Sequence, residues 1–137
     1  MMRLAVSSRG VNGITLVSDA IAAAGHGKGE YLMGNQMITV DHNGAHLADG
    51  TLAGSAILLD DAVRNAVRFG VCTLAEAVQM ASLTPARILG ISERKGQIAP
   101  GYEADLVVLD ADLQVKLTIV GGQIAYHRID NESILKH

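Results

Sequence analysis

Asp19 is the residue of this chain whose type and surroundings best suit acid–base chemistry. It stands in the segment Ser18-Asp19-Ala20, directly after the run Ile14-Thr15-Leu16-Val17. A short apolar run of this kind predicts a buried strand, which here would end on a carboxylate. In α/β barrels the catalytic side chains lie at the C-terminal ends of the parallel strands. Asp19 is therefore a candidate acid–base catalyst, although the residues alone also allow it to cap the segment that follows.

Histidine and cysteine are the other residue types that often carry chemistry. The chain has five histidines and one cysteine, namely His26, His42, His46, His127, His137 and Cys72. No two histidines form a His-x-His pair, and we interpret all five as surface or structural residues. The single cysteine excludes an internal disulfide, and we interpret it as a small buried apolar residue. The sequence therefore predicts no metal site built from this chain.

The composition indicates a globular protein without a nucleic-acid or membrane partner. Of the 137 residues, 49% are hydrophobic and 18% are charged, and the formal net charge is −3. This charge gives no basic footprint for nucleic acid, and aromatic residues, at 3%, are too few for a base-stacking surface. No apolar run approaches the roughly 18 residues of a membrane helix. The N-terminus lacks the apolar core of a signal peptide, so we expect a cytoplasmic protein.

The elements around Asp19 follow from turn and capping signals. A helix is expected to end over Leu4–Arg9, with Gly10 as its C-cap. Residues 20–35 are expected to form a glycine-rich loop that permits close approach of a ligand, or one that is simply flexible. Strands are expected at 36–40 and 45–48, joined through the hairpin turn Asp41-His42-Asn43-Gly44.

A helical block is predicted next. The first helix is expected to run from a Ser55 cap to Arg68, with its charged and polar residues on a solvated face; these are Asp60, Asp61, Arg64, Asn65 and Arg68. Thr73 and Glu76 form a capping box for a second helix that ends near residue 82. Pro85 begins a third helix, which Gly90 stops.

The last third of the sequence changes to strand periodicity. Strands are expected at 104–110, 115–119 and 123–126, followed by a polar tail. The predicted elements do not close a barrel, because they comprise one apolar strand, a hairpin, helices and antiparallel strands. A complete α/β barrel takes roughly 250 residues, or at least 200. The chain therefore has the organisation of the end of something longer.

Three groups of motifs follow one another along the chain. They are Leu16–Ala20 with Ala23-Ala24-Gly25, then Ala48–Ser55 with Asp61–Asn65, and then Met80–Arg87 with Gly96–Gly101 and Ala104–Val107. In this order they resemble the C-terminal part of the N-acetylglucosamine-6-phosphate deacetylases of the amidohydrolase superfamily. The second group is the most specific, whereas the third is shared by amidohydrolases of other substrate classes. The resemblance extends over residues 4–122, nearly the whole chain.

The resemblance implies an α/β fold, the C-terminal part of a (β/α)8 metal-dependent hydrolase barrel plus strands of a small β-sandwich. Residues 1–100 would be the C-terminal end of the barrel, with its eighth strand, a hairpin loop and the closing helices. Residues 101–130 would be the C-terminal strands of the sandwich, and residues 131–137 a polar tail.

The resemblance also implies the chemistry. The activity would be hydrolysis of N-acetyl-D-glucosamine 6-phosphate to D-glucosamine 6-phosphate and acetate in amino-sugar catabolism. In the family a divalent metal, zinc or a similar ion, binds the attacking water, and the aspartate matched by Asp19 takes its proton and later protonates the leaving amine. The segment matched by Leu52, Ala53 and Gly54 contacts the sugar, largely through its backbone.

The metal and phosphate ligands of the family precede the eighth strand, and no residue of this chain matches them. We therefore expect a C-terminal fragment that is inactive alone. Its partners would be a sugar-phosphate substrate and, for the complete enzyme, a second copy in a homodimer. Three alternatives stay open: an amidohydrolase for another amide, a non-catalytic interaction module with an exposed strand edge, and one half of a split enzyme completed by an N-terminal chain.

Overall fold

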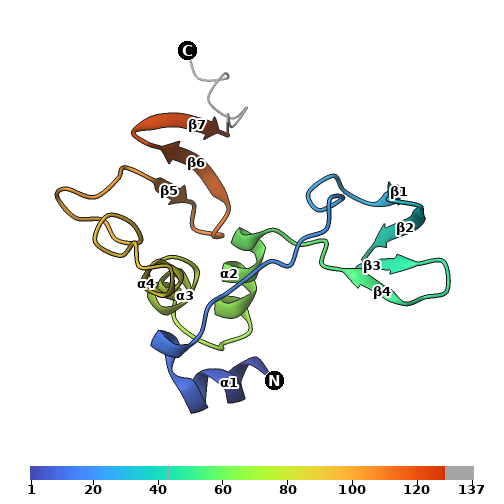
Figure 1. Ribbon diagram of the computed structural model, residues 1–137, viewed down its shortest axis with the longest axis horizontal. Helices are drawn as coiled ribbons and strands as arrows, with labels where there is room; N and C mark the ends of the chain where they lie inside the picture. Colours follow the sequence, from blue (N-terminus) through green and yellow to red (C-terminus); the bar gives the residue numbers. More distant parts are fainter. Residues whose placement is uncertain (43, 129–137) are drawn as a thin grey trace.

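The computed structural model describes residues 1–42 and 44–128. Helices and strands alternate in blocks along the chain (Figure 1). The helices are α1 (Met2–Arg9), the 3-10 helix η1 (Val11–Gly13), α2 (Leu59–Arg68), α3 (Leu74–Ala81) and α4 (Leu83–Ile88). The strands are β1 (Gly29–Met33), β2 (Gln36–Asp41), β3 (Gly44–Leu47), β4 (Leu52–Gly54), β5 (Leu106–Leu109), β6 (Val115–Val120) and β7 (Gln123–His127).

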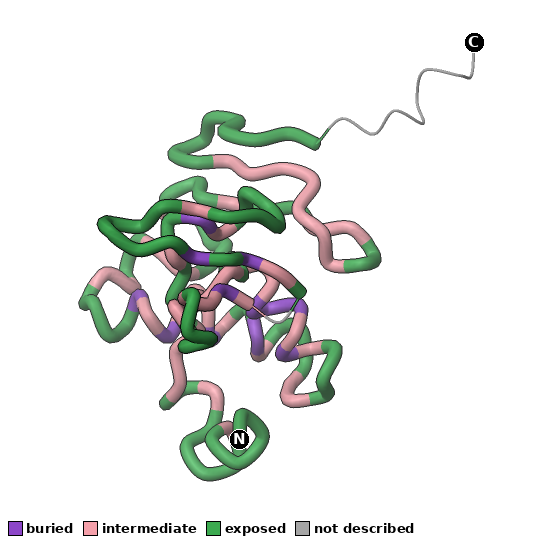
Figure 2. Tube along the Cα trace, turned by 90° about the vertical axis from the view of Figure 1, so that its right-hand side faces the viewer, coloured by how far each residue is buried: buried purple, intermediate pink, exposed green. Residues whose placement is uncertain are grey.

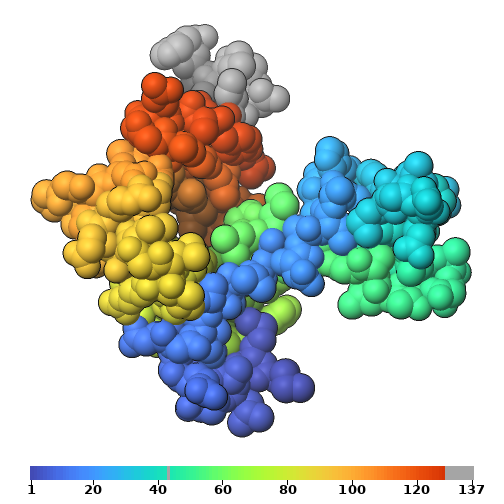
Figure 3. Space-filling model, in the orientation of Figure 1, coloured from blue at the N-terminus to red at the C-terminus, as the bar shows by residue number. Residues whose placement is uncertain are grey.

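The strands form two antiparallel sheets of consecutive strands, β1-β2-β3-β4 and β5-β6-β7. The first sheet stands to one side of the helices and is joined to them by the chain segments that precede β1 and follow β4 (Figures 1 and 3). The second sheet lies beside helices α2 to α4 (Figure 1). The polypeptide is thus an α/β chain whose sheets are antiparallel.

The predicted hairpin is confirmed, and it is larger than expected. In the described residues, β2 pairs antiparallel with β3, from Ile38 opposite Leu47 to Asp41 opposite Gly44. Asn43, within the predicted turn, lies outside the described residues.

The expected glycine-rich loop is partly a strand, because Gly29–Met33 pairs with β2 as β1. Alternation explains this: Tyr31 is half-buried while its neighbours face solvent, so the segment adds one apolar contact to the sheet.

The predicted caps of α1 and α3 are confirmed, whereas α4 begins at Leu83, before the expected Pro85, and α2 lacks its expected Ser55 cap. Thr73 begins α3 with reciprocal bonds, since its backbone N–H donates to Glu76 Oε2 at 2.8 Å and its Oγ1 accepts from Glu76 N at 3.3 Å. Helix α2 begins at Leu59, so the prediction of a Ser55 cap is wrong. The Asp61 carboxylate accepts the Leu58 N–H at 3.2 Å and supplies the helix start instead. Ser55 is occupied elsewhere, pairing with the chain at Ala20.

The predicted buried strand at Ile14–Val17 is wrong for the structure of this chain. Residues 14–19 form neither helix nor strand, and Val17 is 70% exposed. A parallel strand requires neighbouring strands whose backbone groups donate and accept hydrogen bonds along its edges. The Leu16 N–H donates to the Met80 carbonyl at 3.0 Å, and Ala20 forms a single parallel bridge to Ser55. No further strand lies beside this segment within residues 1–42 and 44–128.

Buried residues form two separate hydrophobic clusters. Most other residues along the chain are half-buried or exposed (Figure 2). The sheet cluster contains Ala23, Ile38, Val40 and Ala45. The helical cluster contains Val63, Ala66 and Ala77, with Leu16 and Cys72 packed against it. Cys72 is half-buried, which raises the pKa of its thiol, and Glu76 adds to this effect.

No helix among the described residues is long and apolar enough to cross a membrane. The predicted polar tail 131–137 and His137 lie outside the part of the chain that the structure describes. The three C-terminal strands of the sequence-based prediction are confirmed as β5, β6 and β7.

Candidate active site

Asp19 lies at the wall of an open pocket of about 710 Å³ between the start of the first sheet and the chain that leaves it. Leu52 and Gly54 line the same pocket, together with Ser55. Residues separated by more than thirty positions in sequence are therefore brought to one concave surface. This is the juxtaposition that the sequence motifs required, since acid–base and substrate-contacting residues must face a common ligand.

The backbone at Asp19 is fixed by two hydrogen bonds to Ser55. The Ser55 N–H donates to the Asp19 carbonyl at 3.3 Å, and the Ile21 N–H donates to the Ser55 carbonyl at 2.9 Å. Asp19 has a positive φ of 50°, one of two such non-glycine residues among those described. Aspartate and asparagine tolerate this left-handed region better than other non-glycine residues. The side chain itself is exposed, on the pocket.

The predicted substrate segment is strand β4 itself, Leu52–Gly54. The turn before it is set by Asp49, whose carboxylate accepts the Thr51 N–H at 2.9 Å. That backbone hydrogen bond holds the pKa of Asp49 below its ordinary value. Leu52 is exposed and Gly54 half-buried, and both line the pocket. Ala53 belongs to the same strand but packs against the sheet cluster instead.

Sequence reasoning missed two basic groups on the pocket. Lys28 comes from the glycine-rich loop and His42 from the β2–β3 turn, and both are exposed at the pocket wall. A loop followed by a hairpin was the available signal, because a hairpin returns the chain to its starting point. Periodicity alone gives no distance between two such turns.

The histidines do not gather with acidic or sulfur side chains. Among residues 1–42 and 44–128 no three His, Cys, Asp or Glu side chains are placed so that they could hold a metal ion. The His26 ring lies beside the Tyr31 ring at an interplanar angle of 51°, with ring centroids 6.3 Å apart, and His46 lies within β3. The donor set of a divalent metal site is therefore not formed by the described residues.

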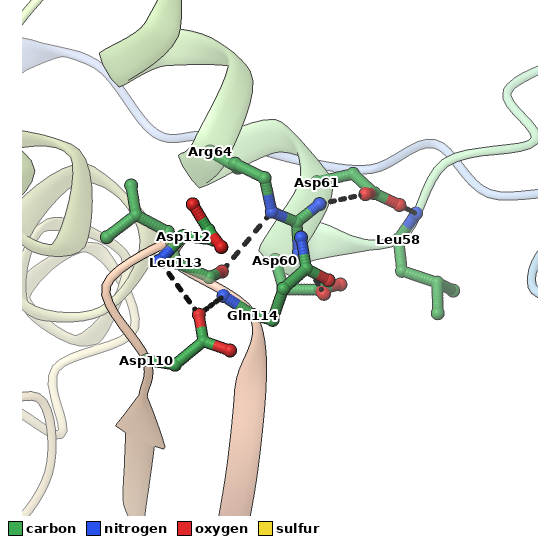
Figure 4. Close-up of polar contacts among 8 residues, drawn as sticks. All are labelled: Leu58, Asp60, Asp61, Arg64, Asp110, Asp112, Leu113 and Gln114. Atoms are coloured by element: carbon green, nitrogen blue, oxygen red, sulfur yellow. Dashed lines mark hydrogen bonds and ion pairs between the residues drawn. The ribbon is translucent and has the colours of Figure 1, made fainter.

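Outside the pocket, the polar cluster around Arg64 contradicts the predicted solvated face of α2. Arg64 is only 5% exposed; its guanidinium bonds both Asp60, at 2.9 Å, and Asp61, and its Nε donates to the Leu113 carbonyl at 3.2 Å (Figure 4). Burial opposes the charge, but hydrogen bonds to Asp61 and Asp60 outweigh it and raise the pKa of Arg64. The helical periodicity placed Arg64 correctly on a polar stripe, but only the packing of the β5–β6 turn on that stripe buries it.

Comparison with known proteins decides the family. The Amidohydrolase family model matches residues 2–125. The chain belongs to the amidohydrolase family. The N-acetylglucosamine-6-phosphate deacetylase of Lysinibacillus sphaericus is 42% identical over 123 residues, which are 90% of this chain and 32% of that protein. The N-acetylgalactosamine-6-phosphate deacetylase of Escherichia coli O157:H7 is 41% identical over 112 residues, 82% of this chain and 30% of that protein.

Solved structures of the family share the fold of this amidohydrolase chain. The crystal structure of the N-acetylglucosamine-6-phosphate deacetylase from Thermotoga maritima superimposes with a TM-score of 0.82 at 38% identity, covering 93% of this chain and 35% of that one. The chain spans about a third of the length of these relatives.

Proposed function

We propose that this amidohydrolase chain supplies the proton-transferring carboxylate and part of the sugar site of an enzyme that deacetylates N-acetyl-D-glucosamine 6-phosphate. The products would be D-glucosamine 6-phosphate and acetate. The observation that carries the proposal is the pocket that joins Asp19 to strand β4. The similarity to deacetylases of amino-sugar phosphates supports this substrate class.

In this proposal Asp19 is the catalytic residue. Amide hydrolysis needs a group that removes a proton from the attacking water and then protonates the leaving nitrogen, and one carboxylate can do both in sequence. The bonds to Ser55 hold the Asp19 backbone, which favours this role because acid–base catalysis requires fixed geometry. The exposed side chain is accessible to a substrate in the pocket.

Leu52, Ala53 and Gly54 are proposed as substrate-binding residues. Leu52 and Gly54 reach the pocket directly, and strand β4 ends there. Leu52 would present an apolar surface to the sugar, while the backbone of the strand would offer polar groups. Ala53, which packs into the sheet cluster, would contribute through its backbone.

A divalent ion such as zinc belongs to the chemistry of the family in general. The described residues do not provide its ligand set, so we derive no step through a metal from this chain. When bound in the complete enzyme, the ion would activate water. What this chain contributes is the carboxylate that exchanges protons.

Architecture and partners extend the same proposal. Residues 1–100 would belong to the C-terminal end of a (β/α)8 barrel, and residues 101–130 to a small β-sandwich. The lengths of the relatives support this arrangement, since the chain covers 32% of the Lysinibacillus sphaericus protein. The remaining part of the enzyme would come from the same polypeptide or from a complementing N-terminal chain, and the complete enzyme would be a homodimer. A cytoplasmic location would suit a phosphorylated substrate, whose charge prevents unaided passage through a membrane.

The test is an exchanged enzyme, in which this chain replaces the matching segment of the Lysinibacillus sphaericus deacetylase. Acetate release is measured from N-acetylglucosamine 6-phosphate and N-acetylgalactosamine 6-phosphate, and ring opening is measured for a cyclic amide. We expect the highest kcat/KM with N-acetylglucosamine 6-phosphate. The galactosamine epimer is the second candidate substrate, because the Escherichia coli relative that carries its name is 41% identical.

The control is the same host enzyme with the segment deleted, which should release no acetate. Circular dichroism and size-exclusion mass verify that the exchanged enzyme is folded. A folded exchanged enzyme that hydrolyses the cyclic amide but neither sugar phosphate would contradict the proposed substrate class.

A further inference from the structure

The chain that enters the first sheet and the chain that leaves it touch beside the proposed catalytic carboxylate. Asp19–Ile21 runs parallel to Gly54–Ser55, joined by the hydrogen bonds Ser55 N to Asp19 O (3.3 Å) and Ile21 N to Ser55 O (2.9 Å). We call these two bonds the 19–55 bridge. Resting on the function proposed above, we propose that Gly54 is a positioning residue, whose missing side chain lets the 19–55 bridge form and so sets the place of Asp19.

The close approach of Gly54 to Ile21 is the first reason. A Cβ atom added to Gly54 would lie 2.5 Å from Ile21 Cγ2, far inside van der Waals contact, and 3.9 Å from the Asp19 carbonyl oxygen. Ile21 also packs against the sheet cluster, so its side chain has little freedom to move away. Relief of the contact would therefore come from the backbone, which is the backbone that carries Asp19.

The backbone angles are the second reason. Gly54 has a φ of 132°, which residues with a side chain rarely adopt, and Asp19 has a φ of 50°. Two uncommon conformations thus face each other across the bridge, and each requires the other strand to stay in place. A left-handed residue next to a ligand pocket is held only where surrounding contacts over-determine it.

This positioning role of Gly54 differs from direct contact with the sugar. A residue that only contacts the substrate changes KM when it is altered, whereas a residue that positions the acid–base group changes kcat. Misplacement of a reacting group by about 1 Å can lower the rate by about 10²-fold. The two roles are therefore separable by kinetics.

The experiment compares Gly54→Ala with Gly50→Ala. Gly50 is a matched control because it also has a positive φ, of 82°, but a Cβ added there would meet nothing within 4 Å. In the 137-residue chain, amide hydrogen exchange of Ile21 and Ser55 reports the 19–55 bridge without any need for activity. We expect exchange about tenfold or more faster in Gly54→Ala, and unchanged exchange at these amides in Gly50→Ala.

In the exchanged enzyme, Gly54→Ala should lower kcat by about 10²-fold with little change in KM. Adding Ile21→Ala, which removes the atom that the new Cβ would meet but leaves the strained φ of 132°, should restore part of the protection of the bridge and part of kcat. In an Asp19→Asn background, Gly54→Ala should cause no further loss, because the group that it positions is already absent.

Unchanged exchange at Ile21 and Ser55 in Gly54→Ala would overturn the inference whatever the activity. A raised KM with unchanged kcat would also overturn it, since Gly54 would then act on the substrate alone. Additive losses with Asp19→Asn would show a general structural effect and would equally count against the inference. Failure of the proposed function looks different: the unsubstituted exchanged enzyme would release no acetate, while hydrogen exchange would still report the bridge.

Discussion

At the residue scale, Asp19 combines an uncommon backbone angle with an accessible carboxylate. Its φ of 50° suits aspartate and asparagine and disfavours most other residues. Asparagine is therefore expected to keep the backbone conformation while removing the carboxylate that is proposed to exchange protons. The position thus offers a substitution that separates chemistry from folding.

Asp19→Asn in the exchanged enzyme is expected to lower kcat by about 10²–10⁴-fold, because acid–base catalysis supplies a factor of this order. Substrate affinity, measured as the dissociation constant by calorimetry, should change little, since the amide has the shape of the carboxyl group. Asp112→Asn, on an exposed turn away from the pocket, is the control and should leave kcat unchanged. Near-normal turnover of Asp19→Asn would refute the catalytic role.

Arg64 is the second residue with a defined physical task. It joins helix α2 to the turn between β5 and β6, where the Asp110 carboxylate accepts the N–H groups of Asp112 (2.9 Å) and Gln114 (2.8 Å) (Figure 4). That turn, with Leu113 at a φ of 60°, presents the Leu113 carbonyl to Arg64. The helices and the second sheet are thus connected through one guanidinium.

Arg64→Met is expected to lower the free energy of unfolding by about 2–3 kcal/mol, because a half-buried carbonyl and two partly buried carboxylates lose their charged partner. The exposed Arg68→Met, on the same helix, should change it by less than about 0.5 kcal/mol. Urea titration of the 137-residue chain measures both. Equal midpoints for the two variants would show that the Arg64 contacts do not stabilise the fold.

At the element scale, the segment between α4 and β5 is tied to the second sheet by a small ionic network. Lys95 contacts Glu103, at 2.5 Å, and Asp105, while Arg94 also contacts Glu103. Asp105 Oδ1 in turn accepts the Gly121 N–H of the β6–β7 turn at 2.8 Å. All four side chains are at least partly exposed, so the ion pairs are expected to contribute only modestly to the stability of the fold.

This network predicts a pH dependence. Lys95 holds the pKa of Glu103 and of Asp105 below their ordinary values, with Arg94 adding to the first and the Gly121 N–H to the second. A lowered carboxyl pKa stabilises the fold above the unfolded value, about 4, and the effect is lost as the pH falls through the folded value. The pKa of Lys95 is raised, mainly by Asp105, so its contribution is present below about 10.4 and lost above it.

Lys95→Met should therefore lower the Tm at all values between about pH 5 and pH 9, and the difference should shrink as the pH falls below about 4. Lys28→Met, an exposed lysine on the pocket, is the control and should show no such profile. Thermal unfolding followed by circular dichroism gives the comparison. A Tm difference that does not shrink as the pH falls from about 5 to about 2 would exclude the ionic explanation.

At the scale of the whole molecule, the two buried clusters lie in different parts of the chain. Ile38, fully buried, belongs to strand β2 of the first sheet, and Met80, also fully buried, belongs to helix α3. The first sheet reaches the helices through two chain segments (Figure 3). Local stability follows local packing, so the two parts are expected to open independently.

Ile38→Ala and Met80→Ala test this independence. Each removes a fully buried side chain and is expected to cost about 2–5 kcal/mol in its own part. Hydrogen exchange should accelerate in β1–β4 for the first variant and in α2–α4 for the second. Acceleration of both parts by either variant would show one cooperative unit instead.

Some elements of the fold could be predicted from the sequence, whereas others depended on the tertiary structure. The Thr73–Glu76 box and the 36–47 hairpin were predictable because their signals are local: a cap and a turn act over a few residues. Ile14–Val17 was not, since an apolar run becomes a strand only beside hydrogen-bonded neighbours. Arg64 was placed on its helix face by periodicity, but its burial depends on a turn 49 positions away.

For the candidate site, the sequence by itself determined the residue types, since the motif around Asp19 and the segment 48–55 indicated an amidohydrolase and its family model matches residues 2–125. Only the tertiary structure decided that Asp19 and strand β4 share a pocket and that Gly54 lies against Ile21. The physical reason is that residue chemistry and local propensity are encoded over short stretches, whereas the approach of two distant backbones depends on the pairing between them.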